Sequence, residues 1–314
     1  MKAVVFDSAL KYVADRPEPV APEGWSRIRV ILAGICKTDL ELIKGYRGFR
    51  GVLGHEFVGR VEAADGRPGR RVVGDINAAC GRCEWCARGL GRHCPNRVTL
   101  GIDRLDGCMA EVCALPDANL LDVPDGLSDA RAVLVEPLSA ACEILEQHPL
   151  RGGERVAVLG DGKLGILCAW VLAGAGADVT LAGRHAEKLA LARWHTVKTW
   201  PAAEPLAGGF DLVVEATGSE AGLARAIELC RPRGTVVLKS TVAAPHQLHL
   251  APVVIHELTL LGSRCGRFED GLAFLARHPD VPLDRLIAAR YPIEQAEEAF
   301  RTAAGSSLKV LLTI

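Results

Sequence analysis

The sequence lacks an excess of charge of either sign, an export signal and any long apolar run. Its 37 Lys and Arg residues nearly balance its 38 Asp and Glu residues, which gives a net charge of −1. No electrostatic attraction to nucleic acid or to an anionic membrane surface is therefore expected. No apolar run reaches the roughly 18 residues that span a bilayer, and residues 1–19 contain no apolar core of a signal peptide. With neither internal repeats nor low-complexity tracts, the chain is expected to be cytoplasmic and globular.

The bulk composition is that of an ordinary globular protein. Hydrophobic residues make up 49% of the 314 residues and charged residues 24%, which is enough for roughly two domains with sizeable cores. Eleven cysteines without a recognisable export signal indicate a reducing compartment and thiols rather than disulfides. Six of them have no metal-like spacing, and we expect them to be small buried side chains: Cys108, Cys113, Cys142, Cys168, Cys230 and Cys265.

Four cysteines stand close together in the segment CGRCEWCARGLGRHC. Cys80, Cys83, Cys86 and Cys94 have the spacing C-x2-C-x2-C-x7-C, which brings four thiolates within reach of one tetrahedral metal ion. An all-thiolate site has no open position, so we predict a structural zinc. One alternative is an iron–sulfur cluster, although the ferredoxin pattern ends in x3 and not x7. The other is a set of free or disulfide-bonded cysteines.

The texture of the chain changes near residue 138. Before it, short apolar or alternating runs are separated by Gly, Pro and Asp, which predicts strands over residues 3–6, 27–33, 56–62 and 71–73. After it, strands alternate with helices, which predicts a parallel α/β sheet. The expected elements are a helix over 138–147, strands over 156–159, 178–182, 211–215 and 235–239, and a helix over 220–229. The last residues predict an amphipathic helix over 293–304 and a strand over 308–314.

Gly160, Gly162 and Gly165 form the pattern G-x-G-x-x-G directly after a predicted strand. The pattern alone is weak, but here it opens a helix inside a βαβ unit, which is the context that indicates dinucleotide binding. The glycines permit a tight turn and a close approach to a pyrophosphate, and the helix N-terminus supplies free N–H groups. Lys163 and Leu164 belong to the same predicted site. The alternative is a glycine-rich turn with no ligand.

The end of the second α/β strand indicates which coenzyme binds. NAD sites carry a carboxylate there for the ribose hydroxyls, whereas this chain has Gly183, Arg184 and His185. The Arg184 guanidinium and Lys188, one turn into the next helix, are suited to a 2′-phosphate. We therefore predict a preference for NADP. NAD is the alternative if these cations are simply a solvated helix start.

Three scattered residues have the chemistry of an open zinc site. Cys36, His55 and Glu136 supply a thiol, an imidazole and a carboxylate. Catalytic zinc uses three protein ligands and keeps a fourth position for water or substrate. Spacing alone does not assign these residues, because a lone residue of each type usually belongs to a core or a surface.

Six motifs together resemble those of the zinc-dependent medium-chain dehydrogenases/reductases, the family of alcohol, polyol and threonine dehydrogenases. They occur in the family's order over nearly the whole chain: GICKTD (34–39), GHE (54–56), the four-cysteine segment, EPLS (136–139), GDGKLG (160–165) and EATGS (215–219). The resemblance implies an α/β protein of two domains. One is a β-rich GroES-like catalytic domain, residues 1–137 and 266–314, and the other is a Rossmann-fold coenzyme domain, residues 138–265.

The resemblance also implies a set of zinc ligands. They are Cys36, His55 and Glu136, and the glutamate at this last position is similar to the polyol and threonine branch of the family. In that family Glu56 can also approach the metal in exchange with water. Whether Glu56 or Glu136 is the third ligand at rest is left open. Asp39 is implied to orient His55 through a ring N–H.

Further roles follow from the same resemblance. Thr38 matches the hydroxyl that hydrogen-bonds the substrate oxygen and begins a proton relay, with a helix cap as the alternative. Many members have a histidine at the outer end of that relay. Glu41 stands there in this chain, and it either passes protons or is simply solvated. Lys37, Thr217 and Lys309 match coenzyme-binding positions, the two lysines near the pyrophosphate unless they are ordinary solvated side chains.

The prediction is a zinc-dependent oxidoreductase that transfers a hydride between the carbinol carbon of an alcohol or polyol and NADP, giving an aldehyde or ketone. The alternatives are an NAD-linked threonine- or sorbitol-like dehydrogenase and a catalytically idle dinucleotide-binding protein of the same fold. Two zinc ions per chain would support the enzyme, whereas one in the four-cysteine segment would support the idle protein. We expect a small-molecule substrate, a homodimer or homotetramer, and no nucleic-acid or membrane partner.

Overall fold

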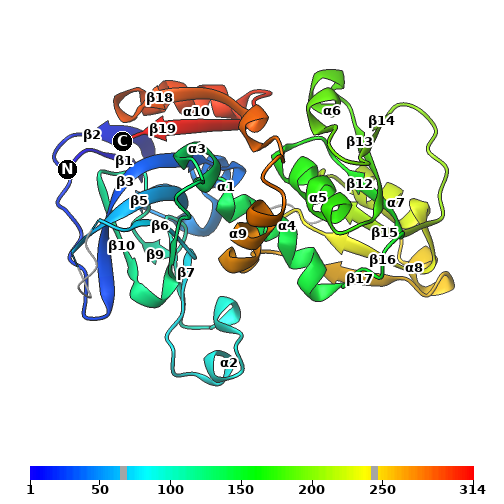
Figure 1. Ribbon diagram of the computed structural model, residues 1–314, viewed down its shortest axis with the longest axis horizontal. Coiled ribbons are helices and arrows are strands. Elements are labelled where there is room, and N and C mark those ends of the chain that lie inside the picture. The colour runs from blue at the N-terminus through cyan, green and yellow to red at the C-terminus, as the bar shows by residue number, and fades with distance from the viewer. Residues whose placement is uncertain (64–68, 242–246) are drawn as a thin grey trace. The chain divides into compact units, whose positions relative to one another are not determined.

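The structure, a computed structural model, describes residues 1–63, 69–241 and 247–314 (Figure 1). It divides into two compact units. Unit 1 consists of Met1–Glu136 together with Leu283–Ile314, and unit 2 consists of Pro137–Pro282. Within the described residues, no helix is both long and apolar enough to cross a membrane.

Unit 1 is built mainly from antiparallel strands. Its largest sheet has the order β11-β6-β5-β3-β19-β18, with β10 also paired to β3, and two smaller sheets have the orders β2-β1-β4 and β7-β8-β9. The strands are β1 (Ala3–Asp7), β2 (Ala9–Val13), β3 (Trp25–Ile35), β4 (Gly51–Val52), β5 (Glu56–Ala63), β6 (Arg71–Gly74), β7 (Asn77–Ala78), β8 (Val98–Leu100), β9 (Arg104–Leu105), β10 (Val112–Pro116), β11 (Leu120–Asp122), β18 (Ile287–Pro292) and β19 (Lys309–Thr313). The helices are α1 (Lys37–Leu42), α2 (Glu84–Ala87), α3 (Asp129–Ala132) and α10 (Ala296–Ala304).

Strand β3 organises unit 1. Burial alternates along its first half and becomes continuous from Leu32 to Ile35, as expected for a strand that passes from one exposed face into the core. Strand β19 pairs with β3 on one side and with β18 on the other. The C-terminal tail therefore completes the sheet that the N-terminal residues begin, and it belongs to the same unit.

The four cysteines lie in a lobe between β7 and β8. The lobe contains the short helix α2 and a 3-10 turn over Gly91–His93, and Figure 1 shows it projecting away from the strands of unit 1. So short a helix has little stability of its own, which makes the lobe a segment that needs a further source of order.

Unit 2 is a doubly wound sheet. Its six parallel strands have the order β14-β13-β12-β15-β16-β17, which is the Rossmann order with its reversal between β12 and β15. The strands are β12 (Arg155–Leu159), β13 (Asp178–Gly183), β14 (Lys198–Pro201), β15 (Phe210–Glu215), β16 (Cys230–Leu238) and β17 (Thr259–Gly262). The helices are α4 (Val135–Gln147), which begins in unit 1, α5 (Lys163–Gly174), α6 (Ala186–Ala192), α7 (Glu220–Leu229), α8 (Ala251–Ile255) and α9 (Phe268–Arg277). The predicted fold class is confirmed.

The second domain boundary differs from the predicted one. Residues 266–282 belong to unit 2, not to the catalytic unit, because α9 packs there through its apolar face. A Cβ on Gly174 of α5 would lie 2.9 Å from the Phe274 ring, and that ring is 6.1 Å from the ring of Trp194.

Candidate zinc and coenzyme sites

The first predicted zinc ligand sits where a strand gives way to a helix. Strand β3 ends at Ile35 and α1 begins at Lys37, which leaves Cys36 at the N-cap with extended backbone angles. Asp39, in the first turn of α1, accepts a hydrogen bond from the Cys36 backbone N–H at 2.8 Å. This half of a capping box holds the backbone at Cys36 in place at the start of α1.

Strand pairing brings the other donors to the same place. His55 directly precedes β5, and Glu56 begins it opposite Gly34 of β3. The sulfur of Cys36, a ring nitrogen of His55 and a carboxylate oxygen of Glu56 lie within 4.8 Å of one another. A Cβ on Gly34 would lie 2.3 Å from the Glu56 carboxylate, so this position has no room for a side chain.

A buried carboxylate stands behind His55. The ring Nδ1 of His55 lies 3.3 Å from Oδ1 of Asp39, and the side chains of His55 and Asp39 are 3% and 0% exposed. Burial alone would lower the pKa of His55, but the Asp39 carboxylate and the neighbouring Cys36 thiol raise that pKa well above its ordinary value. With Nδ1 facing Asp39, Nε2 remains as the atom for a metal, the usual arrangement of a carboxylate, a histidine and zinc.

Glu56 has a cationic partner that the sequence did not predict. One of its carboxylate oxygens pairs with the ammonium of Lys309, and both side chains are fully buried. The same ammonium donates to the Ile35 carbonyl at 2.9 Å. The structure thus gives Lys309 two partners in the core of unit 1, which differs from the expected lysine open to a coenzyme phosphate.

The residues present fit zinc. A thiol, an imidazole and a carboxylate are the donors that zinc prefers, and His55 already has the supporting carboxylate that zinc-bound histidines use. The strong rise in the pKa of His55 reflects local negative charge of the kind that a dication would offset. Glu136, the second residue of α4 and half-buried, is not among the donors that lie within 4.8 Å of one another.

The residues of the predicted proton relay lie along α1. The Thr38 hydroxyl oxygen is 3.8 Å from the Cys36 sulfur. The ammonium of Lys44 donates to the Glu41 carboxylate at 3.1 Å, and the Glu41 side chain is 33% exposed. Lys37 is exposed. The roles of these residues stay predictions.

The four cysteines of the lobe converge. The sulfurs of Cys83 and Cys86 are 3.5 Å apart, those of Cys83 and Cys94 3.6 Å, those of Cys80 and Cys94 3.5 Å, and those of Cys80 and Cys86 4.0 Å. Four thiolates at 2.3 Å from one zinc would be about 3.8 Å apart, the edge of the tetrahedron. The sulfur positions therefore fit a closed tetrahedral zinc site.

The glycine turn has the geometry that a dinucleotide site needs. Gly160 has a φ of +115°, and a Cβ on Gly165 would lie 1.9 Å from the Gly160 carbonyl oxygen. Gly162 caps α5, and a Cβ there would meet no atom within 4 Å. The first and third glycines are thus required by the turn itself, while the second leaves open space at the helix N-terminus, where a pyrophosphate binds in this fold.

Comparison with known proteins decides the family. A model described as "Alcohol dehydrogenase GroES-like domain" matches residues 22–125, and one described as "Glucose dehydrogenase C-terminus" matches residues 130–314. An L-threonine 3-dehydrogenase from Streptomyces coelicolor is 32% identical over 99% of each chain. The chain belongs to the zinc-dependent medium-chain dehydrogenase/reductase family.

Two solved structures are similar to this medium-chain dehydrogenase along its whole length. An alcohol dehydrogenase from Escherichia coli CFT073, solved with NADH, is 25% identical with a TM-score of 0.91, covering 100% of this chain and 99% of that one. A zinc-binding dehydrogenase from Sinorhizobium meliloti 1021, solved with NADP, is 29% identical with a TM-score of 0.88 and the same coverage. The protein is a zinc-type, alcohol dehydrogenase-like oxidoreductase with a nicotinamide coenzyme.

The remaining predicted coenzyme residues of this medium-chain dehydrogenase lie at the ends of β12, β13 and β15. Lys163 and Leu164 open α5 and are half-buried. Thr217 follows β15, and both its backbone N–H and its hydroxyl donate to the buried carboxylate of Glu215. Glu215 therefore fixes the turn after β15. A Cβ on Gly160 would clash with this turn, since it would lie 2.8 Å from the Ala216 carbonyl oxygen.

The end of β13 holds a residue that sequence reasoning missed. Arg184 is exposed, and Lys188 and His185 are half-buried. The carboxylate of Asp161, from inside the glycine turn, accepts the His185 backbone N–H at 2.6 Å and lies 3.0 Å from its ring Nδ1. The sequence showed an acidic residue between the first two glycines of the motif, but it did not show that the Asp161 side chain points toward His185.

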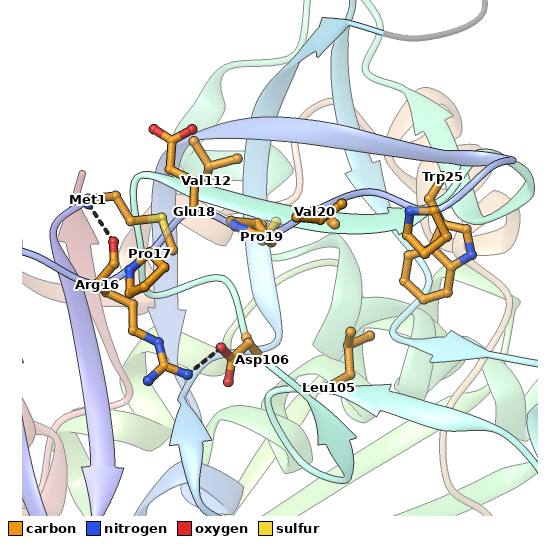
Figure 2. Close-up of a pocket in the computed structure, with 14 residues that line it drawn as sticks. Met1, Arg16, Pro17, Glu18, Pro19, Val20, Trp25, Leu105, Asp106 and Val112 are labelled. Atoms are coloured by element: carbon orange, nitrogen blue, oxygen red, sulfur yellow. Dashed lines mark hydrogen bonds and ion pairs between the residues drawn. The ribbon is translucent and has the colours of Figure 1, made fainter.

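Two other features of this medium-chain dehydrogenase include no predicted site residue. His195, His278 and Asp280 of unit 2 offer donor atoms within 4.8 Å of one another, but one Asp280 oxygen accepts the Trp194 indole N–H at 2.9 Å. A pocket of about 490 Å³ in unit 1 is bordered by the Arg16–Asp106 ion pair (Figure 2), and it is lined by Met1, Arg16, Pro17, Glu18, Pro19, Val20, Pro22, Trp25, Leu105, Asp106, Gly107, Val112, Cys113 and Ala114.

Proposed function

We propose that this enzyme oxidises the carbinol carbon of an alcohol or polyol to a carbonyl, transfers the hydride to a nicotinamide coenzyme, and runs the reverse reduction. The convergence of Cys36, His55 and Glu56 within 4.8 Å carries the proposal. A zinc site with three protein donors keeps a fourth position open for substrate, which catalysis requires and a structural zinc site does not. The catalytic roles are our assignment to these residues.

The chain's own residues position the substrate oxygen and handle its proton. Zinc bound by Cys36, His55 and a carboxylate supplies a Lewis acid that lowers the pKa of an alcohol and polarises a carbonyl. The Thr38 hydroxyl, 3.8 Å from the Cys36 sulfur, accepts the alcohol proton and passes it outward toward solvent. As the C–H bond breaks, its electron pair leaves with the hydride, and the carbon–oxygen double bond forms.

The two carboxylates near the metal have different tasks. Asp39 holds the His55 ring and the Cys36 N–H together, so it fixes the angle at which both ligands reach the metal. Glu56 shares its charge with Lys309, which lowers the net charge that it brings to zinc. The third ligand is Glu56 or Glu136, and Glu56 is the one that lies within 4.8 Å of the other two donors.

Two finer points belong to the proposal. Each chain holds two zinc ions, because the lobe and the Cys36 group both have zinc-like donor sets. The coenzyme is NAD or NADP, since similar structures were solved with NADH and with NADP. In the sequence, the cations Arg184 and Lys188 favour NADP. The Asp161 carboxylate, which lies against the end of β13, favours NAD.

The test is turnover together with metal content. Purified protein is assayed with alcohols, polyols and amino alcohols, with each coenzyme, at the nicotinamide absorbance band. We expect turnover and two zinc ions per chain. Cys36→Ser should retain one zinc and lose at least about 100-fold in kcat/KM, since zinc supplies several kcal/mol of transition-state stabilisation, while Cys230→Ala, in the core of unit 2, should keep both. Wild-type protein that holds two zinc ions and coenzyme yet turns over nothing would overturn the proposal.

A further inference from the structure

Given the proposed function, on which this inference rests, we infer that Asp161 selects NAD over NADP by placing a carboxylate where the coenzyme's adenosine ribose binds. The usual acid at the end of the second strand is absent from this chain. The structure supplies a carboxylate to that place from the glycine turn instead.

The position of this carboxylate is fixed by the sheet. Strands β12 and β13 are paired, and the Gly160 N–H donates to the Ala182 carbonyl at 2.9 Å. The glycine turn therefore lies against the end of β13. A Cβ built on Gly183 would lie 2.4 Å from the Asp161 Cβ and 2.5 Å from its Oδ2. The Asp161 carboxylate thus fills the space that a side chain at Gly183 would need, which is where Rossmann folds place the acid that binds the ribose.

Local hydrogen bonds hold Asp161 in this place and keep it charged. Oδ2 accepts the His185 backbone N–H at 2.6 Å, and the His185 ring Nδ1 lies 3.0 Å from Oδ2 and 3.1 Å from Oδ1. Burial alone would raise the pKa of Asp161, but these bonds and the Arg184 N–H lower it below its ordinary value. The group is therefore a fixed anion at neutral pH.

A fixed carboxylate distinguishes the two coenzymes by what it can accept. An ionised carboxylate is an acceptor only, so it binds the 2′- and 3′-hydroxyls of NAD as donors. The 2′-phosphate of NADP has no matching donor at neutral pH and adds a second anion beside the first. The His185 ring is already turned toward Asp161, so the cations at this strand end that face a phosphate are the exposed Arg184 and the half-buried Lys188, among the residues that the structure describes.

This assignment competes directly with the preference for NADP that Arg184 and Lys188 suggest. The two differ in which group decides. If Asp161 determines the coenzyme preference, replacing Asp161 reduces the preference for NADH over NADPH, and replacing Arg184 has little effect on NADH affinity. If Arg184 decides, wild-type protein already prefers NADPH and loses that preference without the guanidinium.

The experiment measures direct binding of NADH and of NADPH to the zinc-loaded enzyme. Nicotinamide fluorescence and the shift in Tm are the two readouts. We expect wild type to bind NADH about 10- to 100-fold more tightly than NADPH, the range for losing a hydrogen bond to a charged group. Asp161→Asn and Asp161→Ser should reduce this ratio at least tenfold. The matched control, Asp178→Asn, changes a carboxylate at the opposite end of β13 and should leave the ratio unchanged.

A second measurement needs no variant, in case the Asp161 substitutions fail to fold. ADP-ribose should displace NADH from the wild-type enzyme more effectively than 2′-phospho-ADP-ribose. Equal or tighter binding of NADPH by wild type, or an unchanged ratio in a folded Asp161→Ser enzyme, overturns the inference while leaving the proposed function standing. Failure of both coenzymes to bind overturns the two together.

Discussion

Lys309 and Glu56 form an ion pair from which water is excluded, because both side chains are 0% exposed. Removing one member of such a pair leaves an uncompensated buried charge, which costs about 3–5 kcal/mol. We therefore expect Lys309→Met to lower the free energy of unfolding by roughly this amount, measured by urea denaturation. Lys309→Met combined with Glu56→Gln should recover much of the loss, since no charge is then left unpaired.

A surface pair provides the comparison. Lys198 and Asp178 pair with side chains that are 63% and 44% exposed, so Lys198→Met should cost less than about 1 kcal/mol. If Lys309→Met cost no more than Lys198→Met, the Glu56 carboxylate would have to be neutral or hydrated in the folded protein. The double variant separates a charge effect from a packing effect.

The Lys309–Glu56 pair also marks the limit of what residues reveal in isolation. Its members are 253 positions apart in the chain, and they meet only because β19 inserts beside β3. The sequence offered Lys309 as a cation and Glu56 as a carboxylate, but not as each other's partner. Asp161 is similar, since its motif was evident in the sequence while the packing of its carboxylate against Gly183 was not.

The β12–turn–α5 element separates the structural and the binding roles of its glycines. A Cβ on Gly165 would lie 1.9 Å from the Gly160 carbonyl oxygen, whereas a Cβ on Gly162 would meet nothing within 4 Å. We expect Gly165→Ala to force the turn open and to lower both Tm and coenzyme affinity. Gly162→Ala should keep Tm within about 2 °C, because it fills open space, yet weaken NADH binding at least tenfold by blocking the pyrophosphate.

The two readouts make this prediction specific. Tm by calorimetry reports the turn, and NADH titration reports the site. A Gly162→Ala protein that binds NADH like wild type would show that the pyrophosphate does not approach this glycine. A Gly165→Ala protein with unchanged Tm would show that the turn relaxes at little cost.

Elements with local patterns were the predictable ones. The glycine turn, the parallel strands and the four-cysteine lobe each depend on residues within a short stretch, and the structure forms elements at these places. The segment 266–282 was assigned to the wrong unit because its destination depends on tertiary packing, in which Phe274 meets Trp194 and α5. Glu136 shows the same limit. Its distance from Cys36 and His55 depends on how the chain folds and not on the spacing of these residues in the sequence.

At the scale of the whole molecule, both predicted zinc groups belong to unit 1, whereas the glycine turn belongs to unit 2. The lobe has only a short helix and a 3-10 turn of its own, so we expect its order to depend on the proposed zinc. We expect Cys94→Ser to reduce zinc from two ions to one per chain and to expose residues 80–94 to rapid hydrogen exchange. NADH affinity should remain within about twofold, because distant independent sites contribute separately.

Cys36→Ser provides the reciprocal test of this independence. It should also reduce zinc to one ion per chain, but residues 80–94 should stay protected from exchange, because the four lobe sulfurs lie 3.5–4.0 Å apart and are untouched. Metal analysis and hydrogen exchange on the two variants therefore give opposite patterns in the lobe at the same zinc count. Protection of the lobe in zinc-depleted Cys94→Ser would mean that packing of α2 and not the metal orders the segment. Loss of both ions from either variant would mean that the two sites in unit 1 fold as one.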